Sequence, residues 1–237
     1  FIYYIFLISL GVIVRFFSSL ILFLLVCANV MSYDFGYGYE VNDKITAGGY
    51  ISTKYKNTSE KEELELDDIA FLIYGDLNDR FSFLFELESA GTYIHYLNNG
   101  HTEKNIDFQV ERAYLQYSHN EYVSLRVGKF LAQVGLWNLI PIVVFRETSQ
   151  KPRITTEIFP RFTTGVNLSI KANNLKWDLF VQHNDDIDKD YNNFYVKEHY
   201  GVKGSYKIDQ NTFGGNIGWF RDDFLGMDSY YYGIHAK

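Results

Sequence analysis

The chain has 237 residues, which is enough for one large domain or two small ones. Aromatic residues make up 18% of it, including 20 Tyr and 20 Phe, and this composition favours strands over helices. The net charge of −7 argues against nucleic acid as a partner, and the single cysteine, Cys27, excludes an internal disulfide.

Residues 1–32 differ from the rest of the chain because they carry a single charge, Arg15. An apolar run from Phe16 to Val26 and then small and polar residues follow it. This order is typical of a secretory signal peptide, so we predict cleavage after Ser32, with residues 1–14 as an upstream extension or the tail of a truncated start. The alternative is an anchoring transmembrane helix of about 20 apolar residues, but Arg15 divides the stretch into two shorter runs.

After Ser32, apolar and polar residues alternate with a period of two. In "FSFLFELE" (81–88), three phenylalanines and Leu87 fall on one face of a strand, whereas Glu86 and Glu88 fall on the other. The same alternation recurs in the segments 45–55, 123–128, 166–170, 175–182 and 213–219. We therefore predict an all-β chain whose strands each have one strongly apolar face.

Short and long connections alternate along this chain. Short turns are predicted at "GDLNDR", "SHNE", "KANN" and "KIDQN", and long polar connections at 57–67, 90–107, 131–160, 183–198 and 222–229. This sorting predicts a transmembrane antiparallel up-and-down β-barrel, with strands of about 9–11 residues, rather than a soluble sandwich. Tyr and Trp near many strand ends are typical of membrane-interface belts, although the same residues could fill a sandwich core.

The segment 131–160 holds the only three prolines of the chain, Pro141, Pro152 and Pro160. Proline is unfavourable inside a strand ladder, so this segment is predicted to be a connection. Exposure of its apolar run "GLWNLIPIVVF" to water would be energetically unfavourable. We predict that it folds back into the barrel and narrows the lumen, because irregular backbone at membrane depth requires protein or a water-filled cavity around it. The alternative is a surface lid.

The run "RAYLQYSHNEYVSLRVGKFLAQVGLWN", followed by "RFTTGVNL", resembles the porin O and P family, the phosphate-selective porins and their relatives. The features that carry the resemblance are Val127–Phe130, Gly135–Asn138, Pro160 and Thr163–Gly165. It extends from about Lys44 to Gly218 and implies a barrel of about sixteen strands that assembles as a homotrimer. Because the chain offers about nine strands and the start of a tenth, we expect residues 33–237 to be the N-terminal portion of such a barrel.

Basic residues outnumber acidic residues by six to two between Arg126 and Arg161, although the whole chain is acidic. Strand alternation places Arg126 opposite Leu125 and Val127, towards the lumen. Glu86 and Glu88 are expected on the same wall. The candidate pore-lining or constriction residues are Arg126, Lys129, Arg146, Lys151, Arg153, Arg161, Glu86 and Glu88.

These patterns predict a bacterial outer-membrane porin that passes small hydrophilic solutes or ions with a mild preference for anions. We expect its partners to be outer-membrane lipid and the solutes, with no cofactor, metal, nucleic acid or enzymatic activity. The histidines are not spaced as metal ligands, and "NDDIDKDYNN" (184–193) matches a calcium loop in composition only, so we expect a solvated outer loop there. The alternatives are a non-conducting structural or adhesive barrel and, with less support, a membrane-embedded hydrolase.

Overall fold

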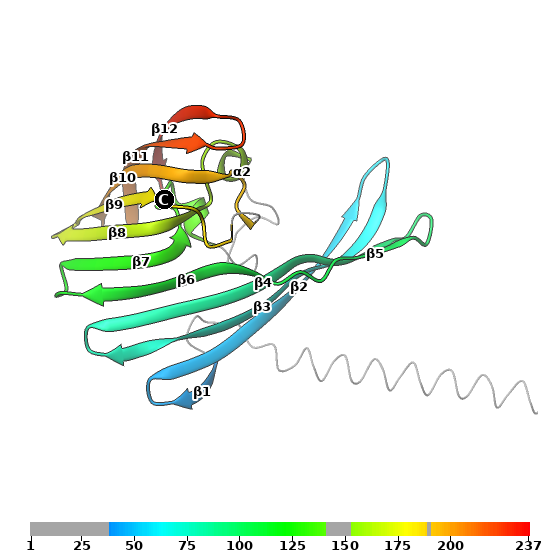
Figure 1. The fold of residues 1–237 in the computed structure, drawn as a ribbon, viewed down its shortest axis with the longest axis horizontal. Coiled ribbons are helices and arrows are strands. Elements are labelled where there is room, and N and C mark those ends of the chain that lie inside the picture. The colour runs from blue at the N-terminus through cyan, green and yellow to red at the C-terminus, as the bar shows by residue number, and fades with distance from the viewer. Residues whose placement is uncertain (1–37, 141–152, 189–190) are drawn as a thin grey trace, which may run out of the picture. The chain divides into compact units, whose positions relative to one another are not determined.

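The computed structural model describes residues 38–140, 153–188 and 191–237, most of which belong to one antiparallel sheet (Figure 1). The predicted signal peptide, residues 1–32, lies outside the described residues. The connection between β7 and β8 contains the 3-10 turn η1 (Trp137–Leu139) and the short helix α2 (Ile154–Glu157). The strands in chain order are β1 (Tyr39–Asn42), β2 (Ile45–Asn57), β3 (Glu62–Asn78), β4 (Phe81–Tyr96), β5 (Thr102–Lys104), β6 (Gln109–Ser118), β7 (Val123–Leu131), β8 (Phe162–Ala172), β9 (Leu175–His183), β10 (Val196–Ile208), β11 (Asn211–Asp222) and β12 (Met227–Ala236).

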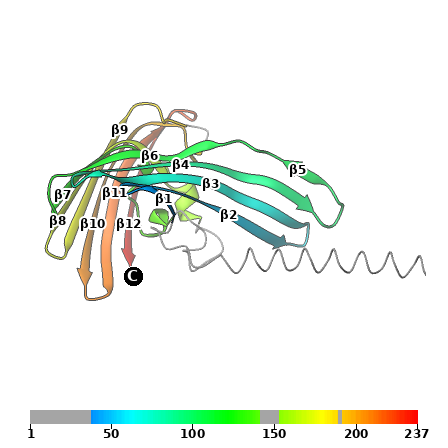
Figure 2. The ribbon, with the colours of Figure 1, turned by 90° about the horizontal axis from the view of Figure 1, so that it is seen from below.

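Each long strand pairs with the next long strand along the chain, and every pairing is antiparallel. Short β5 is off this path and pairs only with β4. Figure 2 shows the strands side by side in a curved sheet. The predicted all-β up-and-down arrangement is therefore confirmed, and β1 and β12 at its two edges do not pair with each other among the described residues. Within that part of the chain, no helix has the length and apolar character needed to cross a membrane.

The two faces of the sheet differ in polarity, as the alternation predicts. One face, here called outward, presents exposed apolar side chains that include Ile51, Phe71, Phe85, Leu115, Val127, Leu179 and Ile217. Cross-strand neighbours continue this surface, since Leu125 lies opposite Leu168 and Leu168 lies opposite Leu179. The other face, here called inward, carries Arg126 and most of the buried polar residues. Such an extensive exposed apolar face suits hydrocarbon rather than water.

The predicted short turns are confirmed, and two of the two-residue turns begin with a residue in the left-handed region of φ. These turns join β8 to β9 and β10 to β11. Their first residues, Asn173 and Asp209, have φ values of 51° and 52°, in the left-handed region that Asn and Asp tolerate better than most residues. Asn and Asp at these positions therefore suit the tight turn that joins the two paired strands.

Two connections predicted to be long are in fact short, because the flanking strands extend further than expected. The chain leaves β2 and enters β3 through residues 58–61, not 57–67, and joins β11 to β12 through 223–226. β3 has 17 residues and β4 has 16, so both exceed the predicted 9–11. Ion pairs explain the error at β3: Lys54 lies 2.5 Å from Asp67 and Lys56 lies 3.1 Å from Glu63. Charged residues predicted to form a polar connection are instead cross-strand partners.

Candidate pore-lining face

The connection between β7 and β8 packs against the inward face of the sheet. Its apolar residues Ala132, Val134 and Phe159 are buried in one cluster with strand residues. The strand members are Phe130, Phe180, Val196, Phe220 and Tyr231, which come from β7, β9, β10, β11 and β12. The apolar composition of this connection therefore has a structural cause, because its described parts form a core with the wall.

Hydrogen bonds hold the two ends of this connection next to each other. The N–H of Ala132 donates to the carbonyl of Arg161 at 2.9 Å. Buried Asn138 donates from Nδ2 to the carbonyls of Ala132 (2.8 Å) and Arg161 (3.0 Å). One side chain thus adds a hydrogen bond to a carbonyl at each end of the connection, and this gives a physical reason for an asparagine at the end of the Gly135–Asn138 run.

The same run is attached to two strands through Gly135, whose φ of +58° favours glycine. The Gly135 N–H donates to Asn216 Oδ1 on β11 at 3.1 Å. Lys203 Nζ on β10 donates to the Gly135 carbonyl at 2.6 Å. Lys203 is almost fully buried, so its desolvated ammonium group needs a hydrogen-bond acceptor, and the Gly135 carbonyl supplies one.

Arg126 lies on the inward face, on the side that the alternation predicts. Its guanidinium donates to Gln116 Oε1 from Nε (3.2 Å) and Nη2 (2.8 Å), and lies 4.4 Å from the centre of the Tyr114 ring. It has no acidic partner within ion-pair distance among the described residues. Gln116 and Tyr114 hold the side chain in place without neutralising its charge.

The other predicted basic residues that the structure describes have acidic partners. Fully buried Lys129 lies 3.3 Å from Asp186 Oδ1 and donates to the Asp188 carbonyl at 2.8 Å. Arg161 lies 3.9 Å from Glu111 and stacks on Phe162. Arg153 has an 86% exposed side chain and pairs with Glu157, which holds its pKa above the ordinary range. Arg146 and Lys151 lie outside the described residues.

Glu86 and Glu88 are buried together on the inward face, where Glu111 joins them. Glu86 pairs with Arg112, and Glu88 accepts hydrogen bonds from the hydroxyls of Tyr50 and Tyr191. Oxygens of the three carboxylates lie within 4.8 Å of one another, a spacing that could hold a metal ion. Arg112 and Arg161 place positive charge beside these carboxylates, so the group forms an ion-pair network.

Simple alternation misses Glu111, because a register shift interrupts the pairing of β4 with β6. Arg112 lies opposite Glu86, but Val110, not Glu111, lies opposite Leu87. The extra residue lets Glu111 and Arg112 both be buried although they are adjacent in the sequence. Two adjacent charged residues, Glu111 and Arg112, interrupt the alternation of β6 and are the sequence signal of this bulge.

The connection between β9 and β10 is not the solvated outer loop that its composition indicates. Asp186 is buried and accepts a hydrogen bond from Thr164 Oγ1 at 2.5 Å. Tyr191 packs its ring on Phe162. Burial and the nearby Glu111 and Glu88 carboxylates raise the pKa of Tyr191, so its hydroxyl stays protonated and donates to Glu88. A polar sequence does not reveal whether its groups form hydrogen bonds with water or with one another, and this explains why the prediction of a solvated outer loop is wrong.

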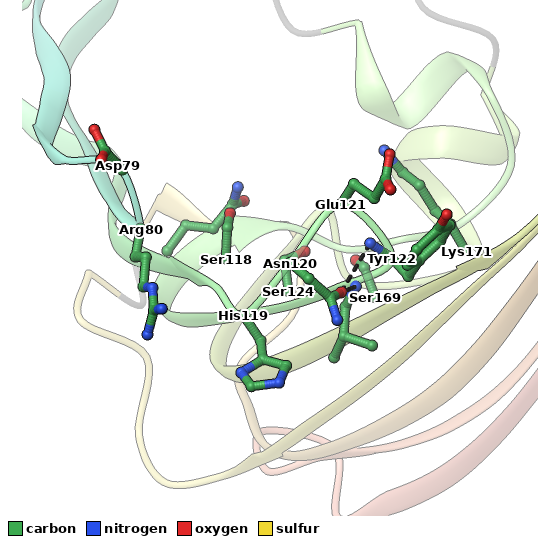
Figure 3. Close-up of a pocket in the computed structure, with 12 residues that line it drawn as sticks. Asp79, Arg80, Ser118, His119, Asn120, Glu121, Tyr122, Ser124, Ser169 and Lys171 are labelled. Atoms are coloured by element: carbon green, nitrogen blue, oxygen red, sulfur yellow. Dashed lines mark hydrogen bonds between the residues drawn. The ribbon is translucent and has the colours of Figure 1, made fainter.

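A polar cavity of about 500 Å³ lies at the short-turn end of β6, β7 and β8 (Figure 3). Figure 3 shows basic and acidic side chains around it, with Arg80 and Asp79 on one side and Lys171 and Glu121 on another. Ser124 and Ser169 supply hydroxyl groups between them. Because Ser124 is two residues from Arg126 on the same strand, this cavity and the arginine belong to one polar strip of the inward face.

Residues 47–206 match the model of a family described as phosphate-selective porin O and P. The match covers well over half of the chain and includes Arg126, the β7–β8 connection and the β9–β10 connection. The chain belongs to this family. The predicted resemblance is therefore confirmed, and membership makes the protein an outer-membrane porin, a channel rather than an enzyme. A search of curated proteins finds no match.

Proposed function

We propose that this porin forms a water-filled channel through which small hydrophilic solutes diffuse, with a mild preference for anions. Segment 131–160 narrows the lumen, and the charges that line it set the local potential. We further infer that residues 1–32 direct export, that residues 33–237 belong to the barrel and that the porin assembles as a homotrimer.

One observation carries the anion preference, namely that Arg126 faces inward with no carboxylate beside it among the described residues. Lys129, Arg153 and Arg161 each have an acidic partner, so their fields are largely compensated. A narrow channel with low-dielectric walls focuses the field of an uncompensated charge. The charge of Arg126 therefore outweighs the net charge of the whole chain in determining which ions enter.

The packing of the β7–β8 connection supports the narrowing. Ala132, Val134 and Phe159 are buried against wall residues, and Asn138 and Lys203 attach the segment by hydrogen bonds. Because the described parts lie on the inward face, they occupy space on the lumen side of the sheet. A surface lid would leave this apolar cluster without its partners.

The test is the reversal potential of the full-length porin in a planar lipid bilayer under a KCl gradient. Arg126→Glu reverses an inward charge that has no acidic partner among the described residues, so the reversal potential should shift towards that of a cation-selective channel. Arg221→Glu is the matched control, because Arg221 is exposed on the outward face, on the side of Trp219. Equal reversal potentials for wild type and Arg126→Glu would contradict the proposed selectivity. A folded porin that conducts no ions would favour the non-conducting structural or adhesive barrel.

A further inference from the structure

The β9–β10 connection contacts both the wall of the sheet and the β7–β8 connection. We use the term polar strap for Asp186, Asp188, Tyr191, Asn192 and Asn193. In Figure 1 this connection lies close to β8 and to the segment that carries α2. Its hydrogen bonds fall into two groups, one directed to the wall and one directed to residues 156–161.

The first group fixes the strap to four neighbouring strands. Tyr191 donates to Glu88 on β4, and the N–H of Val110 on β6 donates to Asp188 Oδ2 at 3.0 Å. Lys129 on β7 and Thr164 on β8 bind Asp188 and Asp186, respectively. The strap therefore reaches from its own strands, β9 and β10, across the inward face as far as β4.

The second group centres on Asn193, which makes three hydrogen bonds to the β7–β8 connection. Its Nδ2 donates to the carbonyls of Thr156 and Phe159, both at 2.9 Å. Its Oδ1 accepts from the N–H of Arg161 at 2.8 Å. All three partners are backbone groups that have no ladder partner in this connection, so a single side chain fixes the course of residues 156–161 as they approach β8.

Asn192 joins the two groups of bonds. Its Nδ2 donates to Asp186 Oδ2 at 3.0 Å, and its Oδ1 accepts from the N–H of Asn193 at 3.0 Å. Breaking one member of a buried polar network leaves its partners unsatisfied, which costs more than an average hydrogen bond contributes. Loss of any one of these side chains should therefore weaken the attachment of the whole network.

We propose that the polar strap is the positioning element of the pore: it holds residues 156–161 against the wall and so fixes the free cross-section of the channel, with Asn193 as the key positioning residue. The effect on the cross-section depends on the proposed function, because it requires segment 131–160 to narrow the lumen. The attachment itself does not depend on that function.

The experiment compares wild type with Asn193→Ala in the full-length porin and uses two measurements. Hydrogen exchange of the peptide that contains Arg161 reports the attachment, and it should become at least about tenfold faster, which corresponds to about 1.4 kcal/mol. Single-channel recording reports the pore, where mean conductance and open-channel noise should both rise and the size limit for neutral sugars should shift upwards. Asn184→Ala is the matched control, because Asn184 lies in the same connection but is exposed, and within the described part of the chain its side chain bonds to the adjacent Asp185 alone.

The two measurements separate the two proposals. Unchanged exchange at residues 156–161 would overturn the strap, whatever the Arg126 experiment shows. Faster exchange with unchanged conductance, noise and size limit would support the attachment and overturn the narrowing role of segment 131–160. If Asn193→Ala does not fold, Asn193→Asp replaces it, because aspartate keeps the acceptor for the Arg161 N–H and loses both donated bonds. Hydrogen exchange of residues 156–161 in Asn193→Asp should be faster than in wild type. Exchange at the wild-type rate would again overturn the strap.

Discussion

Gly218 on β11 provides the space in which Tyr231 supports the β7–β8 connection. A Cβ atom at this position would overlap the hydroxyl and the ring of Tyr231 and lie 2.8 Å from the carbonyl oxygen of Tyr200, where ordinary contact begins at 3.4 Å. The Tyr231 ring lies 5.7 Å from that of Phe159, and its hydroxyl is hydrogen-bonded to His199 Nε2 at 2.8 Å. Gly218→Ala must therefore displace a ring that is held on two sides.

The cost of this displacement has two parts. The ring has to move by about 1 Å in a close-packed cluster, and overpacking of this kind typically costs about 1–3 kcal/mol. The hydrogen bond to buried His199 is weakened as well, which adds about 1 kcal/mol. The backbone oxygen of Tyr200 cannot rotate away, so relaxation of Tyr231 alone does not remove the strain. We expect Gly218→Ala to lower the free energy of unfolding by roughly 2–4 kcal/mol.

The assay is urea unfolding of the full-length porin in detergent, followed by tryptophan fluorescence. Gly233→Ala is the matched control, because its nearest contact would be an ordinary 3.5 Å from the Asn216 side chain. That variant should be as stable as wild type or slightly more stable, since alanine reduces the entropy of the unfolded chain. Equal midpoints for the two alanine variants would refute the idea that Tyr231 occupies a fixed position between Gly218 and Phe159.

Two further predictions concern charge and export. Asp186→Asn leaves Lys129 without its carboxylate partner and should shift the reversal potential towards that of an anion-selective channel. Asp185→Asn, at an exposed site paired with Lys197, should leave the reversal potential unchanged. No shift for Asp186→Asn would show that the charge of Lys129 does not act on permeating ions. N-terminal sequencing of the membrane-extracted porin should give a start near Tyr33, and retention of residues 16–31 would favour an anchoring helix over a signal peptide.

The fold was predictable from the sequence because its determinants are local. Alternation across "FSFLFELE" places Glu86 and Glu88 on one face whatever the neighbouring strand is, and the structure buries both. Proline marks the segment between β7 and β8 as outside the ladder for the same local reason. Arg126 follows from this logic as well, since its neighbours Leu125 and Val127 are exposed on the outward face.

The errors arise where pairing between distant segments decides the outcome. The ion pairs of Lys54 and Lys56 turn an acidic stretch into part of β3, and nothing local to residues 62–68 reveals these partners. The strap is a second case, because Asn193 is an ordinary loop residue until the carbonyls of Thr156 and Phe159 are placed beside it. Tertiary hydrogen bonds of this kind leave no periodic signal in the sequence.

The sequence also overstates how positive segment 126–161 is, and the structure gives the reason. Charges that are adjacent to an opposite charge produce little field a few ångströms away, because the two potentials nearly cancel and salt screens the remainder over about 8–10 Å. Lys129 and Arg161 are compensated by Asp186 and Glu111, two residues that lie outside the segment in the sequence. Counting charges along the chain includes the cations and omits these partners. Arg126 is different because its neighbours Gln116 and Tyr114 are neutral. A selectivity that depends on one uncompensated guanidinium should be mild, should weaken as ionic strength rises and should be lost on replacing that single residue.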